Sequence, residues 1–148
     1  MPASMSHPYA GDVSATDAWS ALKRVPEATL VDVRTRAEWA YVGLPLLSET
    51  GKSPVLVEWQ SFPSMAVGED FVARLTGELA KRGVGKDAAL FFICRSGSRS
   101  RSAAVALTAA GYSQCFNVAG GFEGPCNQEG HRGTIEGWKA EGLPWAQS

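Results

Sequence analysis

The stretch FFICRSGSRSRSAAVAL, residues 91–107, joins an apolar run to an alanine-rich segment through a short series of arginine, serine and glycine residues. The first part belongs to AALFFIC (88–94), which is continuously apolar, as expected of a strand buried on both faces of a sheet. The part that follows, SAAVALTAAG (102–111), is apolar on almost every side, which predicts a packed helix. A disordered, RNA-binding arginine/serine tract does not fit between two buried elements. We therefore interpret residues 95–100 as a tight strand-to-helix turn.

Strands and helices alternate along the rest of the chain. Hydrophobic patterning predicts strands at 28–34, 53–59 and 115–121, helices at 14–25, 35–41 and 68–83, and a weaker, glycine-interrupted helix at 133–145. This alternation predicts an α/β fold, with a parallel β-sheet and helices on both faces. Ligands of such sheets bind at the carboxyl ends of the strands, and Cys94 is the last residue of its predicted strand.

Length and composition limit the classes of function. The chain has 148 residues, which favours a single domain over 1–148, with a flexible tail over about 1–10. A net charge of −1 gives no general attraction to nucleic acid or to acidic membranes, so we expect neither as a partner. No stretch has the roughly 18 apolar residues of a membrane span, and the N-terminus lacks the features of a secretory signal.

Three cysteines without a CxxC pair argue against a disulfide framework and against a zinc site. We therefore expect no metal, no cofactor and a cytoplasmic location. The sequence leaves the oligomeric state open. Cys115 falls in a predicted strand and is expected in the core, whereas Cys126 lies in a polar loop and is either an additional reactive thiol or without a chemical role.

The turn after residue 94 has the composition of an anion-binding cradle. Small residues let successive backbone amides curl around one point, and the N-terminus of the following helix adds a favourable dipole. A cysteine at the centre of such a cradle is favoured as a thiolate, the reactive nucleophile. We therefore expect an ionised catalytic Cys94 that attracts a small anionic substrate; an inert, buried cysteine is the alternative. The expected site loop is Arg95, Ser96, Gly97, Ser98, Arg99 and Ser100.

Several stretches, taken in order, resemble the rhodanese-like sulfurtransferases. They are LVDVRTRAEWAYVGLP (30–45), CRSGSRSRSAAVALTAAGY (94–112), NVAGGFEG (117–124) and the closing GLPW (142–145). The resemblance implies a rhodanese-like fold and transfer of a sulfane sulfur from thiosulfate or a related donor to a thiol or protein acceptor. Cys94 would carry that sulfur as a persulfide, cradled by the amides of residues 95–100.

The resemblance also assigns supporting roles. Asp32 and Arg34 would hold the catalytic loop by hydrogen bonds; the alternative is a helix cap with a surface ion pair. At least one of Arg95 and Arg99 would contact the substrate, while the other either points to solvent or braces a carboxylate such as Glu38.

Two departures from the family pattern bear on substrate choice. The turn VGLP (42–45) lacks the histidine usual in the family, and the segment 46–66, expected to border the pocket, is longer than the common connection.

Two other functions compete with sulfur transfer. Cysteine phosphatases and arsenate reductases also wrap an anion around a cysteine, but their loops are one residue longer and place an arginine six positions after it. Here that position is Ser100. The second alternative is a non-catalytic, rhodanese-like binding module, against which the intact cysteine loop argues.

Overall fold

A computed structural model describes residues 8–61, 66–67, 71–125, 128–132 and 136–146. In chain order its elements are β1 (Gly11–Val13), α1 (Ala15–Arg24), β2 (Thr29–Asp32), α2 (Arg36–Tyr41), β3 (Leu44–Pro45), the 3-10 helix η2 (Ser48–Thr50), β4 (Val55–Leu56), β5 (Gln60–Ser61), β6 (Ala66–Val67), α3 (Phe71–Lys81), β7 (Ala89–Ile93), α4 (Ser98–Ala109), β8 (Gln114–Val118) and β9 (Trp145–Ala146).

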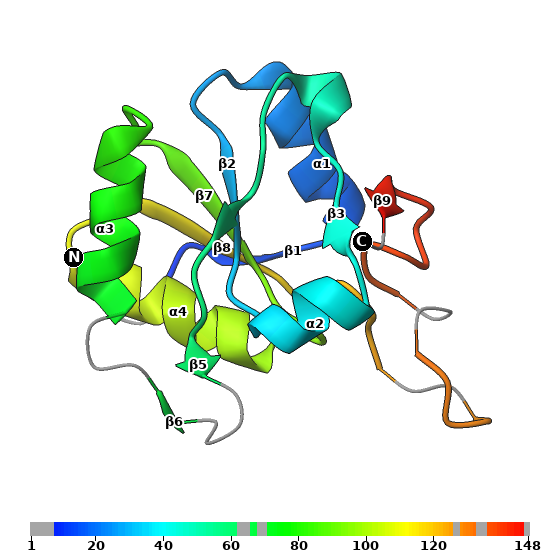
Figure 1. Ribbon diagram of the computed structural model, residues 1–148. Helices are drawn as coiled ribbons and strands as arrows, with labels where there is room; N and C mark the ends of the chain where they lie inside the picture. The colour runs from blue at the N-terminus through cyan, green and yellow to red at the C-terminus, as the bar shows by residue number, and fades with distance from the viewer. Residues whose placement is uncertain (1–7, 62–65, 68–70, 126–127, 133–135, 147–148) are drawn as a thin grey trace.

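Five parallel strands form the central sheet, in the order β1-β8-β7-β2-β4 (Figure 1). The central strand β7 pairs Ile93 with Asp32 of β2, and Phe92 with Asn117 of β8. The carboxyl ends of three adjacent strands therefore meet at one edge of the sheet, which is where Cys94 begins its loop. The predicted parallel sheet is confirmed.

Helices cover both faces of this sheet, as predicted (Figure 1). On β7, Leu90 and Phe92 belong to the core cluster that includes α3 and α4, while Phe91 and Ile93 belong to the cluster that includes α1. This alternation is the two-residue period of a strand, and both of its faces are apolar because both are covered. The same alternation turns Cys94 toward α4.

Helix α4 begins at Ser98, four residues before the predicted start at 102. Gly97 precedes it with φ at +111°, a backbone conformation that favours glycine, and this residue is where the chain turns into the helix. Arginine and serine are tolerated in a helix, so nothing in residues 98–101 delays its start. Ser98, Arg99 and Ser100 therefore belong to the first helical turn rather than to a loop, which corrects the sequence-based boundary.

The helix predicted over 133–145 is wrong for the residues that the structure describes there. Residues 136–144 form turns, and β9 then pairs antiparallel with β3. Gly137 has φ at +102° and lies against the backbone of Gly120, which a helix would not permit. Trp138 fixes these turns because its side chain is fully buried in the core cluster of α1.

The N-terminal segment contains a strand that the sequence patterning did not predict. Strand β1 is only three residues long and adds to the sheet alongside β8. Just before it, Ala10 N donates to Cys115 O at 2.8 Å, so the end of the expected tail is attached to the sheet; residues 1–7 lie outside the described ranges. Among the described residues, no helix is long and apolar enough to cross a membrane.

Candidate active site around Cys94

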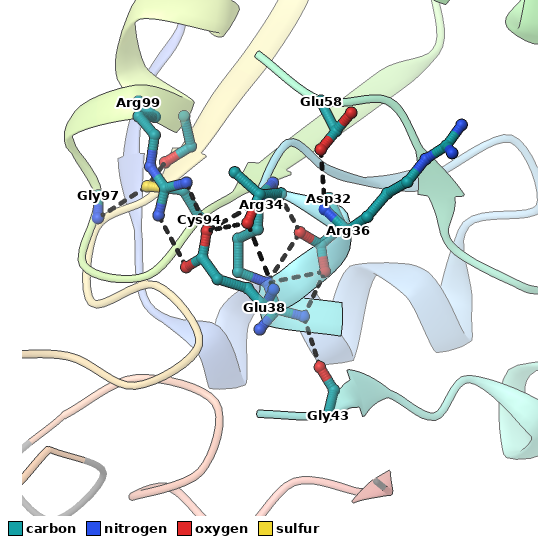
Figure 2. Close-up of polar contacts among 11 residues, drawn as sticks. Asp32, Arg34, Arg36, Glu38, Gly43, Glu58, Cys94, Gly97 and Arg99 are labelled. Carbon is teal, nitrogen blue, oxygen red and sulfur yellow. Dashed lines mark hydrogen bonds and ion pairs between the residues drawn. The ribbon is translucent and has the colours of Figure 1, made fainter. Parts of the chain in front are cut away.

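Cys94 lies between the end of β7 and the first turn of α4, and its exposed fraction is 1%. Gly97 N donates to the Cys94 Sγ at 3.2 Å, a contact that Figure 2 shows as a dashed line. The Ser100 Oγ lies 3.2 Å from the same sulfur. The sulfur therefore accepts from a backbone amide on one side and lies against the Ser100 hydroxyl on the other.

The N-terminus of α4 supplies further donors. An α-helix leaves its first N–H groups without intrahelical acceptors and carries a partial positive charge at that end. In α4 the first N–H to find a helical acceptor is that of Arg101, which donates to Gly97 O, and no side chain in the described part of the chain caps the helix. The amides of the first turn are thus available to an anion beside Cys94.

A turn after β8 supports the cysteine loop through backbone hydrogen bonds. Phe122 N donates to Cys94 O at 2.7 Å, and Glu123 N donates to Arg95 O at 3.0 Å. Gly121 has φ at +63°, and any Cβ there would overlap Arg95 O, so only glycine lets the two backbones approach this closely. The stretch AGGF is therefore part of the site, a role that its glycines alone did not distinguish from an ordinary turn.

Asp32 and Arg34 form a fully buried ion pair, with Arg34 Nη2 2.7 Å from Asp32 Oδ2 and Arg34 Nε 2.9 Å from Asp32 Oδ1 (Figure 2). Arg34 Nη2 also donates to Gly43 O at 2.7 Å, and its guanidinium lies 4.2 Å from the centre of the Phe122 ring. Within the described residues, neither side chain bonds directly to residues 95–100. Arg34 is connected to the loop indirectly, through its contact with Phe122, and the pair is buried, unlike the surface ion pair of the alternative.

Arg99 is paired with Glu38. Its Nη1 and Nη2 donate to the two carboxylate oxygens at 2.7 and 2.9 Å, in the parallel arrangement that arginine and carboxylate favour (Figure 2). Glu38 also accepts from Thr35 N, and the Thr35 hydroxyl in turn accepts from Glu38 N as the N-cap of α2. The first turns of α2 and α4 are therefore joined, and the charge of Arg99 is balanced by an acid that lies 61 residues away in the sequence. Arg95, in contrast, is exposed.

The pKa values of this pair reflect their mutual contact. Burial alone would raise the pKa of Glu38, but the hydrogen bonds and charge of Arg99, the backbone of Thr35 and the charge of Arg34 together lower it below its ordinary value. Burial alone would lower the pKa of Arg99, yet Glu38, with smaller contributions from the charges of Cys94 and Asp32, raises it. Both members of the pair therefore stay charged at neutral pH.

The other residues predicted for the site loop differ in their exposure to solvent. Ser96 and Ser98 are exposed, whereas Gly97 and Ser100 are buried. Cys115 is fully buried in the core, as predicted, and burial raises the pKa of its thiol. Cys126 lies outside the described residues. Among those that are described, no cluster of three or more histidine, cysteine, aspartate or glutamate side chains could hold a metal ion.

The described part of segment 46–66 contributes Leu56, Val57 and Glu58 to a groove. The groove, of about 530 Å³, is lined by residues of α2, α3 and the end of β4, including Trp39, Leu56 and Glu58. A larger hollow of about 650 Å³ includes Lys52 and Arg82 and lies at the amino end of β2. Neither is lined by the cysteine loop, so neither is a preformed chamber for chemistry at Cys94.

The sequence profile of the family described as STR4 middle domain matches residues 10–148, nearly the whole chain. The chain belongs to the STR4 middle domain family. The chain is similar to Rv0390 from M. tuberculosis, which is known from a crystal structure. The two sequences are 44% identical and the two structures have a TM-score of 0.83, over 95% of this chain and 99% of that one.

Two further proteins connect this STR4 middle domain to rhodanese-like folds. The chloroplastic protein THYLAKOID RHODANESE-LIKE of Oryza sativa subsp. indica is 31% identical over 143 residues, which are 95% of this chain and 26% of that protein. The solution structure of the 30 kDa polysulfide-sulfur transferase homodimer from Wolinella succinogenes has a TM-score of 0.58 at 23% identity, and the match covers 95% of this chain and 80% of that one. The expected α/β, rhodanese-like fold is therefore confirmed.

Sequence reasoning missed one buried polar residue next to the site. Asn117 is 2% exposed, and its Oδ1 lies 2.5 Å from the Ser100 Oγ. An asparagine inside the otherwise apolar run CFNVA was the available signal, because buried polar side chains need partners.

Proposed function

We propose that this chain is a sulfurtransferase in which Cys94 carries a sulfane sulfur between a small anionic donor and a thiophilic acceptor. The observation that supports this most directly is the contact of Gly97 N with the Cys94 Sγ, at the N-terminus of a 12-residue helix. A backbone N–H, a helix dipole and a nearby guanidinium all favour the thiolate and an anion bound to it.

The reaction has two displacement steps. In the first, the Cys94 thiolate attacks the outer sulfur of thiosulfate, the bond between its two sulfur atoms breaks, and sulfite leaves with the electron pair. Cys94 then carries a persulfide anion. In the second, a nucleophile such as cyanide or a thiolate attacks the outer sulfur, and the Cys94 thiolate is regenerated. Amides held in place before the reaction stabilise the anionic sulfur with little reorganisation.

Arg99 is the donor-binding group in this proposal. Its guanidinium interacts electrostatically with Cys94, and its side chain is 15% exposed beside that of Glu38, which is 19% exposed. Because Cys94 is 1% exposed, a donor reaches its sulfur only when neighbouring side chains move. An incoming sulfonate can replace the Glu38 carboxylate on Arg99, since both anions present paired oxygens to a guanidinium.

One observation favours a second function, a non-catalytic binding module: Cys94 is nearly sealed from solvent. The two functions differ in a steady-state assay with thiosulfate and cyanide. The sulfurtransferase forms thiocyanate, and Cys94→Ser abolishes its formation while the protein stays folded. A binding module forms none. The cysteine phosphatase alternative would instead release phosphate from an aryl phosphate, and that release would depend on Cys94.

A further inference from the structure

A line of polar side chains leads from Cys94 through the sheet to β1. Ser100 Oγ lies 3.2 Å from Cys94 Sγ and 2.5 Å from Asn117 Oδ1. Asn117 Nδ2 donates to Asp12 Oδ1 at 3.0 Å, and that oxygen also accepts from Tyr9 OH at 2.9 Å. The strand register sets up this line, because Asn117 is the pairing partner of Asp12 in the β1–β8 ladder.

Ser100 has one hydroxyl proton and two neighbouring acceptors, the Cys94 sulfur and Asn117 Oδ1. Ser100 is fully buried and Asn117 is 2% exposed, so these contacts are made away from bulk solvent. The distance of 2.5 Å between the Ser100 Oγ and Asn117 Oδ1 is short for a hydroxyl donor. It favours the orientation in which the hydroxyl proton points to Asn117 Oδ1. Ser100 then presents a lone pair, rather than its proton, to Cys94.

Asp12 fixes the orientation of the Asn117 amide. An ionised carboxylate only accepts hydrogen bonds, so the amide NH2 must face Asp12 and the amide oxygen must face Ser100. A flipped amide would place Oδ1 against the carboxylate and its NH2 against the Ser100 Oγ. The serine proton would then be released toward the Cys94 sulfur. Two orientations of one side chain thus correspond to two hydrogen-bonding states of the cysteine.

We infer that Asn117 is a positioning residue. Held by Asp12, its amide oxygen accepts the hydrogen bond of the Ser100 hydroxyl, so that this hydroxyl does not donate to the Cys94 thiolate. The inference rests on the proposed function only in taking Cys94 as a nucleophile. Its chemical consequence is a thiolate with one fewer hydrogen-bond donor. Such a thiolate is more basic, and the nucleophilicity of thiolates rises with their basicity.

Other charged groups near the sulfur act by separate routes. Arg99 on α4 interacts with Cys94 and with Asp32 at the end of β2, and it is paired with Glu38 on α2. Arg34 lies near Glu38. On the β1 side, Tyr9 interacts with Asp12 and Arg101. Of these groups, only Asp12 is replaced in a variant of the test, so the other charges near Cys94 stay the same.

The test is the pH dependence of Cys94 alkylation by iodoacetamide in the full chain, followed by mass spectrometry of the peptide that contains Cys94. In Asn117→Ala, Ser100 loses its competing acceptor and donates to the thiolate. The pH midpoint of alkylation should fall by about one unit, the size expected for one hydrogen bond to a charged group. The plateau rate at high pH should fall about threefold, because a less basic thiolate is a weaker nucleophile.

Ser100→Ala supplies the second half of a double-mutant cycle. Alone it should move the midpoint little, and in the double variant it should abolish the shift caused by Asn117→Ala. Asp12→Ala, at an exposed residue, should shift the midpoint in the same direction as Asn117→Ala by freeing the amide to flip. Thr29→Ala is the control, since it removes another largely buried side-chain hydrogen bond, made to Glu27 O, at the opposite end of β2, and it should leave the profile unchanged.

Three results would overturn the inference: an unchanged or raised midpoint in Asn117→Ala, a shift that persists in the Ser100→Ala background, or a plateau rate that rises because Cys94 has become exposed. Alkylation does not require sulfur transfer. If the cycle behaves as expected while thiosulfate leaves Cys94 unmodified, the proposed function fails and this inference stands. A Cys94 that resists alkylation at every pH would be a fourth result against the inference, and the thiosulfate experiment would decide the proposed function separately.

Discussion

Gly97→Ala is the most informative single change in the cradle because two features of the structure determine its effect. Gly97 has φ at +111°, which costs a residue with a side chain on the order of 1–3 kcal/mol. A Cβ on Gly97 would also overlap Ala119 O, a backbone atom that cannot rotate away. The start of α4 must therefore shift, and the Gly97 N–H leaves its position 3.2 Å from the Cys94 Sγ.

The loss of one preorganised donor of this kind reduces turnover by roughly 100- to 1000-fold. We therefore expect Gly97→Ala to lower kcat for thiosulfate-to-cyanide transfer about 100-fold, and to lower the free energy of unfolding by about 1–3 kcal/mol. The assay is thiocyanate formation at 25 °C, with urea unfolding measured on the same preparation.

Gly51→Ala is the matched control. Gly51 also has a positive φ, at +75°, but a Cβ there meets no atom within 4 Å. It should lose a little stability and keep full turnover. If Gly97→Ala stays folded with turnover within about threefold of the parent chain, the amide cradle does not stabilise the reacting sulfur and the reasoning is refuted.

Three further outcomes follow from the ion pairs. Glu38→Gln should free Arg99 for the donor and lower KM for thiosulfate about two- to fivefold, the range for a partly exposed ion pair; an unchanged or higher KM would show that Arg99 does not bind the donor. Because the pKa of Glu38 is lowered on folding, its stabilising contribution is present above the unfolded value of 4.5 and is lost as the pH falls through the lower folded value. The difference in unfolding free energy between the parent chain and Glu38→Gln should thus be larger at pH 7 than at pH 3, and an equal difference would contradict this. Asp32→Asn should destabilise the fold by about 3–5 kcal/mol in urea unfolding, since it leaves Arg34 buried without its counter-ion; a loss below about 1 kcal/mol would mean that the pair does not hold Gly43 and Phe122 in place.

Sequence patterning predicted the parts of the fold that have strong local signals. The helices expected at 14–25 and 35–41 are such parts, and the structure forms both, with Ser14 and Thr35 at their N-caps. The apolar run ending at Cys94 indicated a central strand, because a strand covered on both faces has no polar alternation.

The features that the sequence did not predict depend on distant partners. Strand β1 has three residues and no periodic pattern, and only its pairing with β8 makes it a strand. The turns that contain Gly137 form because this residue packs on Gly120, a contact that no local propensity encodes. The hydrogen bond between Ser100 and Asn117 requires α4 to lie against the end of β8, and so depends on the whole sheet.

The central claim is that Cys94 carries sulfur in an amide cradle, and intact-protein mass spectrometry after incubation with thiosulfate tests it most directly. The account predicts a mass increase of about 32 Da, one sulfur atom, with one sulfite released per chain. The increase should disappear on treatment with cyanide and be absent from Cys94→Ser. A parent chain that keeps its mass with thiosulfate and with other sulfane sulfur donors, or a Cys94→Ser variant that still gains the sulfur, would contradict the account.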